Sequence, residues 1–179
     1  MPETGEGGLA LIDEKFDHIS LKHLPASWGA SAKTLEKYLT PAIVTLGNPL
    51  VVQGAKASGQ GNFTTEGLTV IELPLKERPL DGTEAGILDL NLSLRGGHEA
   101  LVELAWGLRD KPSGPSHISF VAGGNDRLLV PLDCSPRWLL SKGITNLKLT
   151  IHHGSEVKRI ELHNGRLRQR SAVAKMESR

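Results

Sequence analysis

The residue with the most obvious chemical potential is a lone cysteine. Cys134 follows Asp133 in the stretch "VPLDCSPRW" and is the only cysteine of the chain. A cysteine nucleophile needs a base and surroundings that lower the pKa of its thiol, whereas a neighbouring carboxylate disfavours the thiolate. Adjacent side chains on an extended segment also point to opposite faces, so the pair forms no dyad. We therefore expect Cys134 to be structural.

Histidines are the next candidates, as metal ligands. His152 and His153 are adjacent and would point to opposite faces of a strand. The stretch "HEALVE", which starts at His98, has Val102 where the H-E-x-x-H zinc motif needs its second histidine. A metal site that combines His98, His117 and His163 would require the fold to bring three separate segments together. We expect no metal and no cofactor.

A carboxylate pair and a glycine-rich segment are the remaining candidates for catalysis. Glu99 and Asp126 could meet in space at the separation that glycosidases use. The segment "GAKASGQG" (54–61) lacks the lysine of a phosphate-binding loop and is predicted to be a flexible loop between two strands. No complete catalytic constellation is present, so we expect the chain not to be an enzyme.

Aromatic side chains bear on sugar binding, because a sugar ring stacks its C–H face on Trp or Tyr. Three Trp, one Tyr and three Phe make only 4% of the chain, so few platforms are available. Trp106 falls on the inward face of a predicted strand and is assigned to the core. Trp28 and Trp138 lie near predicted element boundaries, where either a core or a platform role is open.

Overall charge and hydropathy limit the partners. With 21 basic and 20 acidic residues the formal net charge is +1, which gives no general field for nucleic acid or an anionic membrane. The first residues lack the features of a secretory signal, and no run of about 18 apolar residues occurs. We expect a soluble chain without membrane insertion, cytoplasmic by default unless it is a segment of a longer exported or membrane protein.

The elements that must position these residues are mostly strands. Residues 31–39 carry the signals of one short helix, and from residue 42 onward apolar residues alternate with polar ones. "RGGHE" (95–99) predicts a hairpin or a near relative of one, and Asn164-Gly165 predicts a type I′ hairpin turn. Short strands with Gly, Pro and Asn between them favour an antiparallel β-sandwich. We divide the chain into a leader with a helix (1–41), a sandwich domain (42–167) and a basic flexible tail (168–179). The residues predicted to face the core are Leu88, Leu90, Leu92, Leu94, Val102, Leu104, Trp106, Leu108, Ile118, Phe120, Leu128, Val130, Leu132, Leu147, Leu149, Ile151, Ile160 and Leu162.

The order of these segments resembles a known family. "ILDLNLSL", "LVELAWG", "SHISF", "LLVPLDCSPRWLLSKGITNLKLTI" and "VKRIELHNGRL" follow one another. The series resembles the galactose-binding-like jelly-roll modules that accompany bacterial cell-surface glycosylation and carbohydrate-active proteins. The resemblance implies that "DCSPRW" is the bend between two strands and that Trp138 closes the end of the sandwich. The family often has a calcium-binding loop, for which this chain offers no acidic cluster.

The resemblance implies a non-catalytic carbohydrate-binding or accessory module. The alternative is a structural or assembly protein that packs against a partner protein or its own copies. We expect the ligand, a glycan or a partner protein, to meet the loops that hold "RGGHE", "RDKPSGPSH" and "AGGND". The candidate ligand-binding residues are Trp28, His98, Glu99, Arg109, Asp110, Asn125, Asp126, Arg127 and Trp138.

Overall fold

The computed structural model describes residues 11–12, 19–20, 36–96, 100–109, 117–122, 126–153 and 157–171. These residues are mostly antiparallel strands, with almost no helix. No helix among them is long and apolar enough to cross a membrane. The strands are β1 (Leu11–Ile12), β2 (Ile19–Ser20), β3 (Val44–Thr45), β4 (Leu50–Gly59), β5 (Asn62–Pro74), β6 (Ile87–Arg95), β7 (Ala100–Leu108), β8 (His117–Ala122), β9 (Asp126–Pro131), β10 (Ile144–His152) and β11 (Arg159–Arg168). The helical segments are η1 (Glu36–Tyr38), η2 (Leu132–Cys134) and α3 (Pro136–Leu140).

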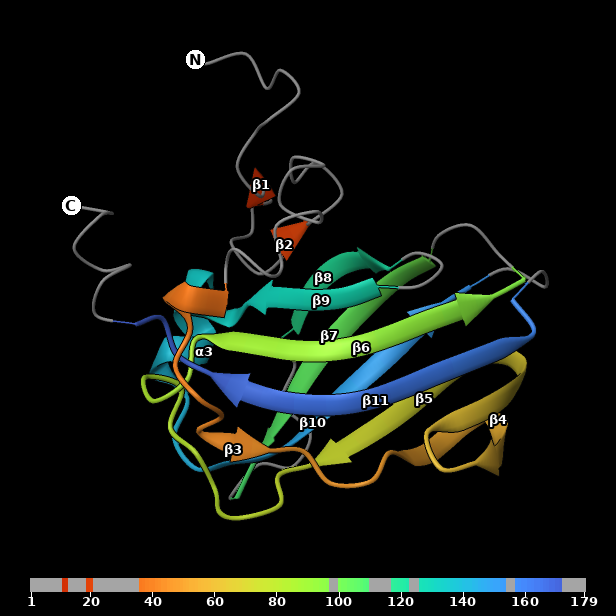
Figure 1. Cartoon of the computed structure of the whole chain (residues 1–179), viewed down its shortest axis with the longest axis horizontal. Coiled ribbons are helices and arrows are strands. Elements are labelled where there is room, and N and C mark those ends of the chain that lie inside the picture. Colours follow the sequence, from red (N-terminus) through yellow and green to blue (C-terminus); the bar gives the residue numbers. More distant parts are fainter. Residues whose placement is uncertain are drawn as a thin grey trace.

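One sheet of nine strands forms the body of the structure. Its order is β8-β7-β10-β5-β11-β6-β9, with β3 added to β11 and β4 added to β5. The sheet curves back on itself into a near-barrel, so that β6, β9 and β11 lie in front of β7, β8 and β10 (Figure 1). β5 joins the two sides, because its first residues pair with β11 and its later residues pair with β10. The prediction of an antiparallel all-β architecture is confirmed at this level.

The core lies between the two sides of the curved sheet. The four alternating leucines of β6 are at most 1% exposed, as their period of two predicts. Phe120 of β8 and Leu149 of β10 are fully buried on the facing strands. Trp106 and Trp138 meet edge to face with ring centroids 5.2 Å apart. Alternation therefore identifies the inward faces of the strands correctly.

The predicted hairpin at "RGGHE" is wrong. β6 pairs with β11 and β9, whereas β7 pairs with β10 and β8. The chain therefore crosses from one side of the near-barrel to the other between these strands. Residues 97–99 themselves lie outside the described part. Alternation marks which face of each strand is apolar, but two consecutive strands can either pair or face each other across the core with the same pattern.

The predicted hairpin turn at Asn164-Gly165 is also wrong, because both residues lie inside β11. His163 stands opposite Asn91 and Arg166 stands opposite Asp89, so β11 has one extra residue between these pairs. Asn164 has a φ of 54°, a left-handed conformation that hairpin turns and β-bulges both use. The bulge resets the alternation of the strand. Downstream of it Leu167 is buried in the core, and the arginines on either side of it, Arg166 and Arg168, both bond to Asp89 on the opposite face of the sheet.

Three short segments near the ends of strands also differ from the prediction. Residues 31–35 of the predicted helix lie outside the described part, and Glu36–Tyr38 forms a short 3₁₀ turn. Residues 54–59, predicted as a loop, belong to β4, and only Gln60 and Gly61 form the turn to β5. The bend at "DCSPRW" spans the end of η2 and the start of α3, whose first turn is capped by Ser135 through a 3.4 Å hydrogen bond from the Trp138 amide.

Candidate functional site

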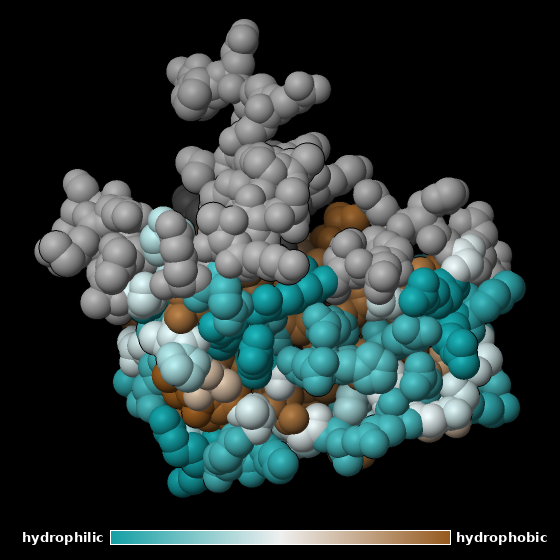
Figure 2. Space-filling view, viewed as in Figure 1, coloured by the Kyte–Doolittle hydropathy of each residue, from teal (hydrophilic) through white to brown (hydrophobic). Residues whose placement is uncertain are grey.

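A polar groove of about 760 Å³ lies on the outer face of β11 and β6. Its walls are the connection from β3 to β4 (45–49), the turn from β4 to β5 (60–61) and the side chain of Arg127 on β9. Figure 2 shows this face as largely hydrophilic, with hydrophobic residues visible between the polar ones. The lining residues are Thr45, Leu46, Gly47, Asn48, Pro49, Gln60, Gly61, Leu73, Lys76, Asp89, Leu90, Asn91, Arg127, Leu162, His163, Asn164, Gly165 and Arg166.

Two glycines allow the wall segments to approach β11. Gly61 has a φ of 70°, and a Cβ atom at this position would lie 2.5 Å from the Nδ1 atom of His163. Its carbonyl accepts a 2.8 Å hydrogen bond from the Leu162 amide. A Cβ atom at Gly165 would lie 2.8 Å from Leu46, whose amide donates a 2.9 Å hydrogen bond to the Gly165 carbonyl. The shape of the groove thus depends on these close backbone contacts.

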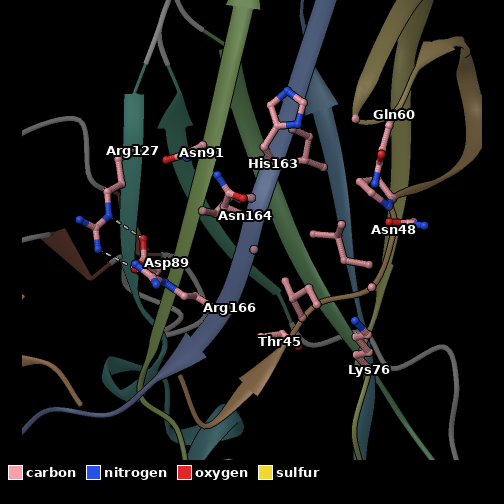
Figure 3. A pocket seen from close by; sticks show the side chains of 18 residues that line it. Thr45, Asn48, Gln60, Lys76, Asp89, Asn91, Arg127, His163, Asn164 and Arg166 are labelled. Atoms are coloured by element: carbon pink, nitrogen blue, oxygen red, sulfur yellow. Dashed lines mark hydrogen bonds and ion pairs between the residues drawn. The ribbon is translucent and has the colours of Figure 1, made fainter. Parts of the chain in front are cut away.

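Five polar side chains face the groove without a hydrogen-bond partner in the described part of the chain. They are those of Asn48, Gln60, Asn91, His163 and Asn164. Figure 3 shows them spread across the groove, from Asn91 on β6 over the bulge to Gln60 and Asn48 on the opposite wall. Each amide offers two donors and one acceptor, and the imidazole offers one donor and one acceptor when it is neutral. The groove can therefore exchange many hydrogen bonds with a ligand that is rich in hydroxyl groups.

An ionic cluster closes one end of the groove around Asp89, which is 2% exposed. Its carboxylate accepts 2.8 and 2.7 Å bonds from Arg127, a 2.8 Å bond from Arg166 and a 2.9 Å bond from Arg168. Burial alone would raise the pKa of Asp89, but the three arginines outweigh it and lower the pKa to about 2. Asp89 occupies a polar position of an alternating strand, but the arginines cover it and keep it from solvent.

Glu36 joins the cluster from η1 and is the second carboxylate in it. It accepts a 2.7 Å bond from Arg168 and a 2.6 Å bond from Arg127. These hydrogen bonds lower its pKa to about 2. Arg168 is 3% exposed and also donates a 2.8 Å bond to the Thr40 carbonyl. The residue that the sequence assigns to a flexible tail therefore anchors the segment before β3 to the sheet.

Aromatic rings do not contribute an exposed platform in the described ranges. Phe63, Trp106, Phe120 and Trp138 are buried, and Tyr38 is partly buried. Trp28 lies outside the described residues. Trp138 donates a 2.7 Å hydrogen bond from its indole nitrogen to the Ala85 carbonyl and is 0% exposed. The prediction that Trp138 could serve as a sugar platform is wrong, because no face of its ring is accessible.

Most residues of the predicted loop cluster lie outside the described part of the chain. His98, Glu99, Asp110 and Asn125 lie outside the described residues, and only the backbone of Asp126, at the start of β9, is described. Arg109 is exposed and follows β7 at the end that lies beside Ile144. The chain leaves β8 beside Ala100, at the other end of β7. Arg109 and Arg127 are therefore not brought together.

Of the predicted site residues that the structure describes, Arg127 alone lines the groove, and the other groove residues were missed. Asn91, His163 and Arg166 are far apart in sequence and meet only through the pairing of β6 with β11. One signal was present in "GRLRQR", where arginines alternate around Leu167 with the period of a strand that has one cationic face.

Cys134 and the adjacent histidines behave as structural residues. Burial, and then the charge of Asp133, raises the pKa of the Cys134 thiol. His152 lies 3.0 Å from Glu103, whereas His153 lies 3.1 Å from the hydroxyl of Thr69. The two histidines thus have separate partners.

Comparison with known proteins gives only distant structural likenesses. No protein-family model matches the sequence, and no curated protein matches it. A family 11 carbohydrate-binding module of the cellulosomal cellulase Lic26A-Cel5E of Clostridium thermocellum has a TM-score of 0.47 at 11% identity, covering 73% of this chain and 91% of that one. The same family of module in complex with a β-1,3-1,4-mixed-linked tetrasaccharide has a TM-score of 0.45 at 10% identity, covering 73% and 94%. PfGH50B has a TM-score of 0.45 at 14% identity, and the match covers 73% of this chain and only 24% of that protein. At this level of similarity the solved structures do not indicate what this chain binds.

Proposed function

We propose that this chain is a non-catalytic glycan-binding or accessory module with a galactose-binding-like jelly-roll fold, of the kind used in bacterial polysaccharide or cell-surface glycan processing. One observation carries the proposal. The groove on β6 and β11 presents five polar side chains that have no internal partner in the described part of the chain.

Hydrogen bonding, and not stacking, would recognise the sugar in this groove. Amide and imidazole groups match the mixed donor and acceptor character of sugar hydroxyls. Leu46 and Pro49, which are both partly exposed, also line the groove and offer apolar contact to the C–H groups of a sugar ring. A small number of placed polar groups over an apolar lining is the usual composition of a ligand site.

A hydrolytic role is not supported by the groove residues. Among the residues that the structure describes, Asp89 is the only carboxylate that lines the groove. Glycosidases use two carboxyl groups, one of which needs a raised pKa to act as an acid. The pKa of Asp89 is about 2, and its oxygens are occupied by arginines. This carboxylate is suited to holding the arginines in place.

The test is a glycan array probed with the wild-type chain and two histidine variants. His163→Ala removes a group that faces the groove, whereas His152→Ala removes an exposed histidine from β10, on the other side of the near-barrel. We expect saturable binding to one class of glycan, weakened by His163→Ala and unchanged by His152→Ala. Binding that both variants retain, or no binding to any glycan by the folded chain, would contradict the proposal.

An assembly role is the second candidate, favoured by apolar exposure on the β4–β5 ribbon. Leu50 is 56% exposed, Val52 is 54% exposed and Leu68 is 41% exposed. β4 pairs with β5 along one edge, and an open edge strand is a template for pairing with another chain. We propose that light scattering after size-exclusion chromatography would detect self-association in the wild type and its loss in Val52→Lys. A wild-type monomer that captures no partner would count against this role.

A further inference from the structure

The ionic cluster at the end of the groove holds more positive than negative charge. Arg127, Arg166 and Arg168 face two carboxylates, those of Asp89 and Glu36. Three cations against two anions leave a formal excess of one positive charge. Among the described residues that line the groove itself, Lys76, Arg127 and Arg166 are basic and Asp89 is acidic. The groove is therefore cationic, although the whole chain is almost neutral.

Two of these arginines have hydrogen-bond donors without a partner among the described residues. Arg166 uses only its Nε atom, so both of its terminal nitrogens lack a partner among the described residues. Arg127 uses Nε and Nη2, so its Nη1 atom lacks one as well. The side chain of Arg166 is 39% exposed and that of Arg127 is 28% exposed. A guanidinium group has five N–H donors in a fixed plane, and these unused donors remain available to a ligand.

Asp89 fixes the two guanidinium groups beside each other. Arg127 Nη2 and Arg166 Nε both bond to the same Oδ2 atom, at 2.7 and 2.8 Å. Figure 3 shows the two side chains directed at Asp89, with Asn91 and Asn164 next to them in the groove. Because the carboxylate already holds these side chains, little conformational entropy would be lost in ordering them when an anion binds. The planar fork of an arginine matches a carboxylate with two parallel hydrogen bonds.

We propose that the groove takes an acidic glycan, one containing uronic acid, and that the sugar carboxylate docks against Arg127 and Arg166. The neighbouring amides then bind the hydroxyl groups of the same and adjoining sugars. Lys76, which is exposed and lies across β11 from Arg127 in Figure 3, adds a second cation at the other side of the groove. This inference rests on the proposed glycan-binding function and specifies the ligand class of that site.

The test uses a panel of oligosaccharides that contain uronic acid, each paired with its carboxyl-reduced neutral counterpart. Binding is measured by calorimetry at two salt concentrations, with the wild-type chain, Arg166→Gln and Arg159→Gln. Arg159→Gln is the matched control, because it removes the same charge from an exposed position of β11 outside the groove. We expect the acidic member to bind about tenfold more tightly than its neutral partner, as one charge-assisted hydrogen bond would provide.

Arg166→Gln should remove most of that preference, and Arg159→Gln should retain it. Added salt should weaken binding of the acidic member, because it screens charge interactions. Equal binding of acidic and neutral members would overturn this inference and leave the proposed function intact. An acidic preference that Arg166→Gln does not change would overturn the assignment of the arginine pair. Binding of neither member by the folded wild-type chain would overturn both proposals.

Discussion

Replacing Asp89 with Asn should destabilise the fold far more than any other isosteric change of a carboxylate on this face. The side chain is 3% exposed and accepts four hydrogen bonds from three arginines. The amide keeps the shape but removes the negative charge. Glu36 would then be the one carboxylate of the cluster left to pair with both Arg127 and the buried Arg168. Breaking a buried ion pair by removing one partner costs about 3 to 5 kcal/mol.

The measurement is urea unfolding followed by tryptophan fluorescence, since Trp106 and Trp138 are buried. The matched control is Glu161→Gln. Glu161 lies 3.5 Å from Arg95 in a pair whose side chains are 51% exposed for the arginine and 23% for the glutamate. A pair of this kind contributes about 1 kcal/mol or less. We expect the free energy of unfolding to fall by about 3 kcal/mol in Asp89→Asn, a large part of the about 5 to 15 kcal/mol of a typical domain. Losses of equal size in the two variants would refute the role given to the buried cluster.

Three further predictions concern acid, backbone strain and the thiol. In the folded state the pKa values of Asp89 and Glu36 are lowered to about 2, from ordinary values of 3.8 and 4.5. The two carboxylates therefore contribute fully to the stability of the fold above these ordinary values, and this contribution is lost as the pH falls toward 2. For Asp89 this amounts to about 2 kcal/mol between pH 6 and pH 2, measurable from urea midpoints, and an unchanged midpoint would contradict it. Gly61→Ala forces a Cβ atom to within 2.5 Å of His163 at a φ of 70° and should cost about 1 to 3 kcal/mol in thermal unfolding; an unaltered melting temperature would argue against the close approach. Burial and the charge of Asp133 raise the pKa of the Cys134 thiol. At pH 8 the folded chain should therefore react with iodoacetamide much more slowly than the chain unfolded in urea, and equal rates would show that the thiol is accessible in the fold.

The sequence indicated the inward faces of the strands but not which strands are neighbours. The four leucines of β6 and Val102 and Leu104 of β7 are buried as their alternation predicted. The same alternation cannot distinguish pairing from facing across the core, which is why the hairpin between β6 and β7 was predicted wrongly. Asn164-Gly165 was misassigned for a related reason, since a bulge and a hairpin turn use the same left-handed backbone.

The candidate site depends on contacts that no local pattern contains. Asp89 occupies a polar position of an alternating strand, and only tertiary structure shows that arginines from β9 and β11 cover it. Arg168 was assigned to a flexible tail because its neighbours are basic, yet the bulge turns it toward Asp89. Arg127 was selected for its loop neighbours, and it lies in the groove because it stands opposite Asn91 in the pairing of β9 with β6.

The proposed function places glycan binding in the groove on β6 and β11. The most direct measurement is a titration of the isotopically labelled chain with an oligosaccharide that binds on the array, followed through its backbone amide resonances. If the groove binds the oligosaccharide, the resonances of Asn91, His163 and Asn164 will shift together and saturate, while that of Lys148 on β10 will not move. Saturable shifts confined to the segments at 97–99, 110–116 and 123–125, with the groove resonances unchanged, would contradict the proposed function and place the binding surface at the loops.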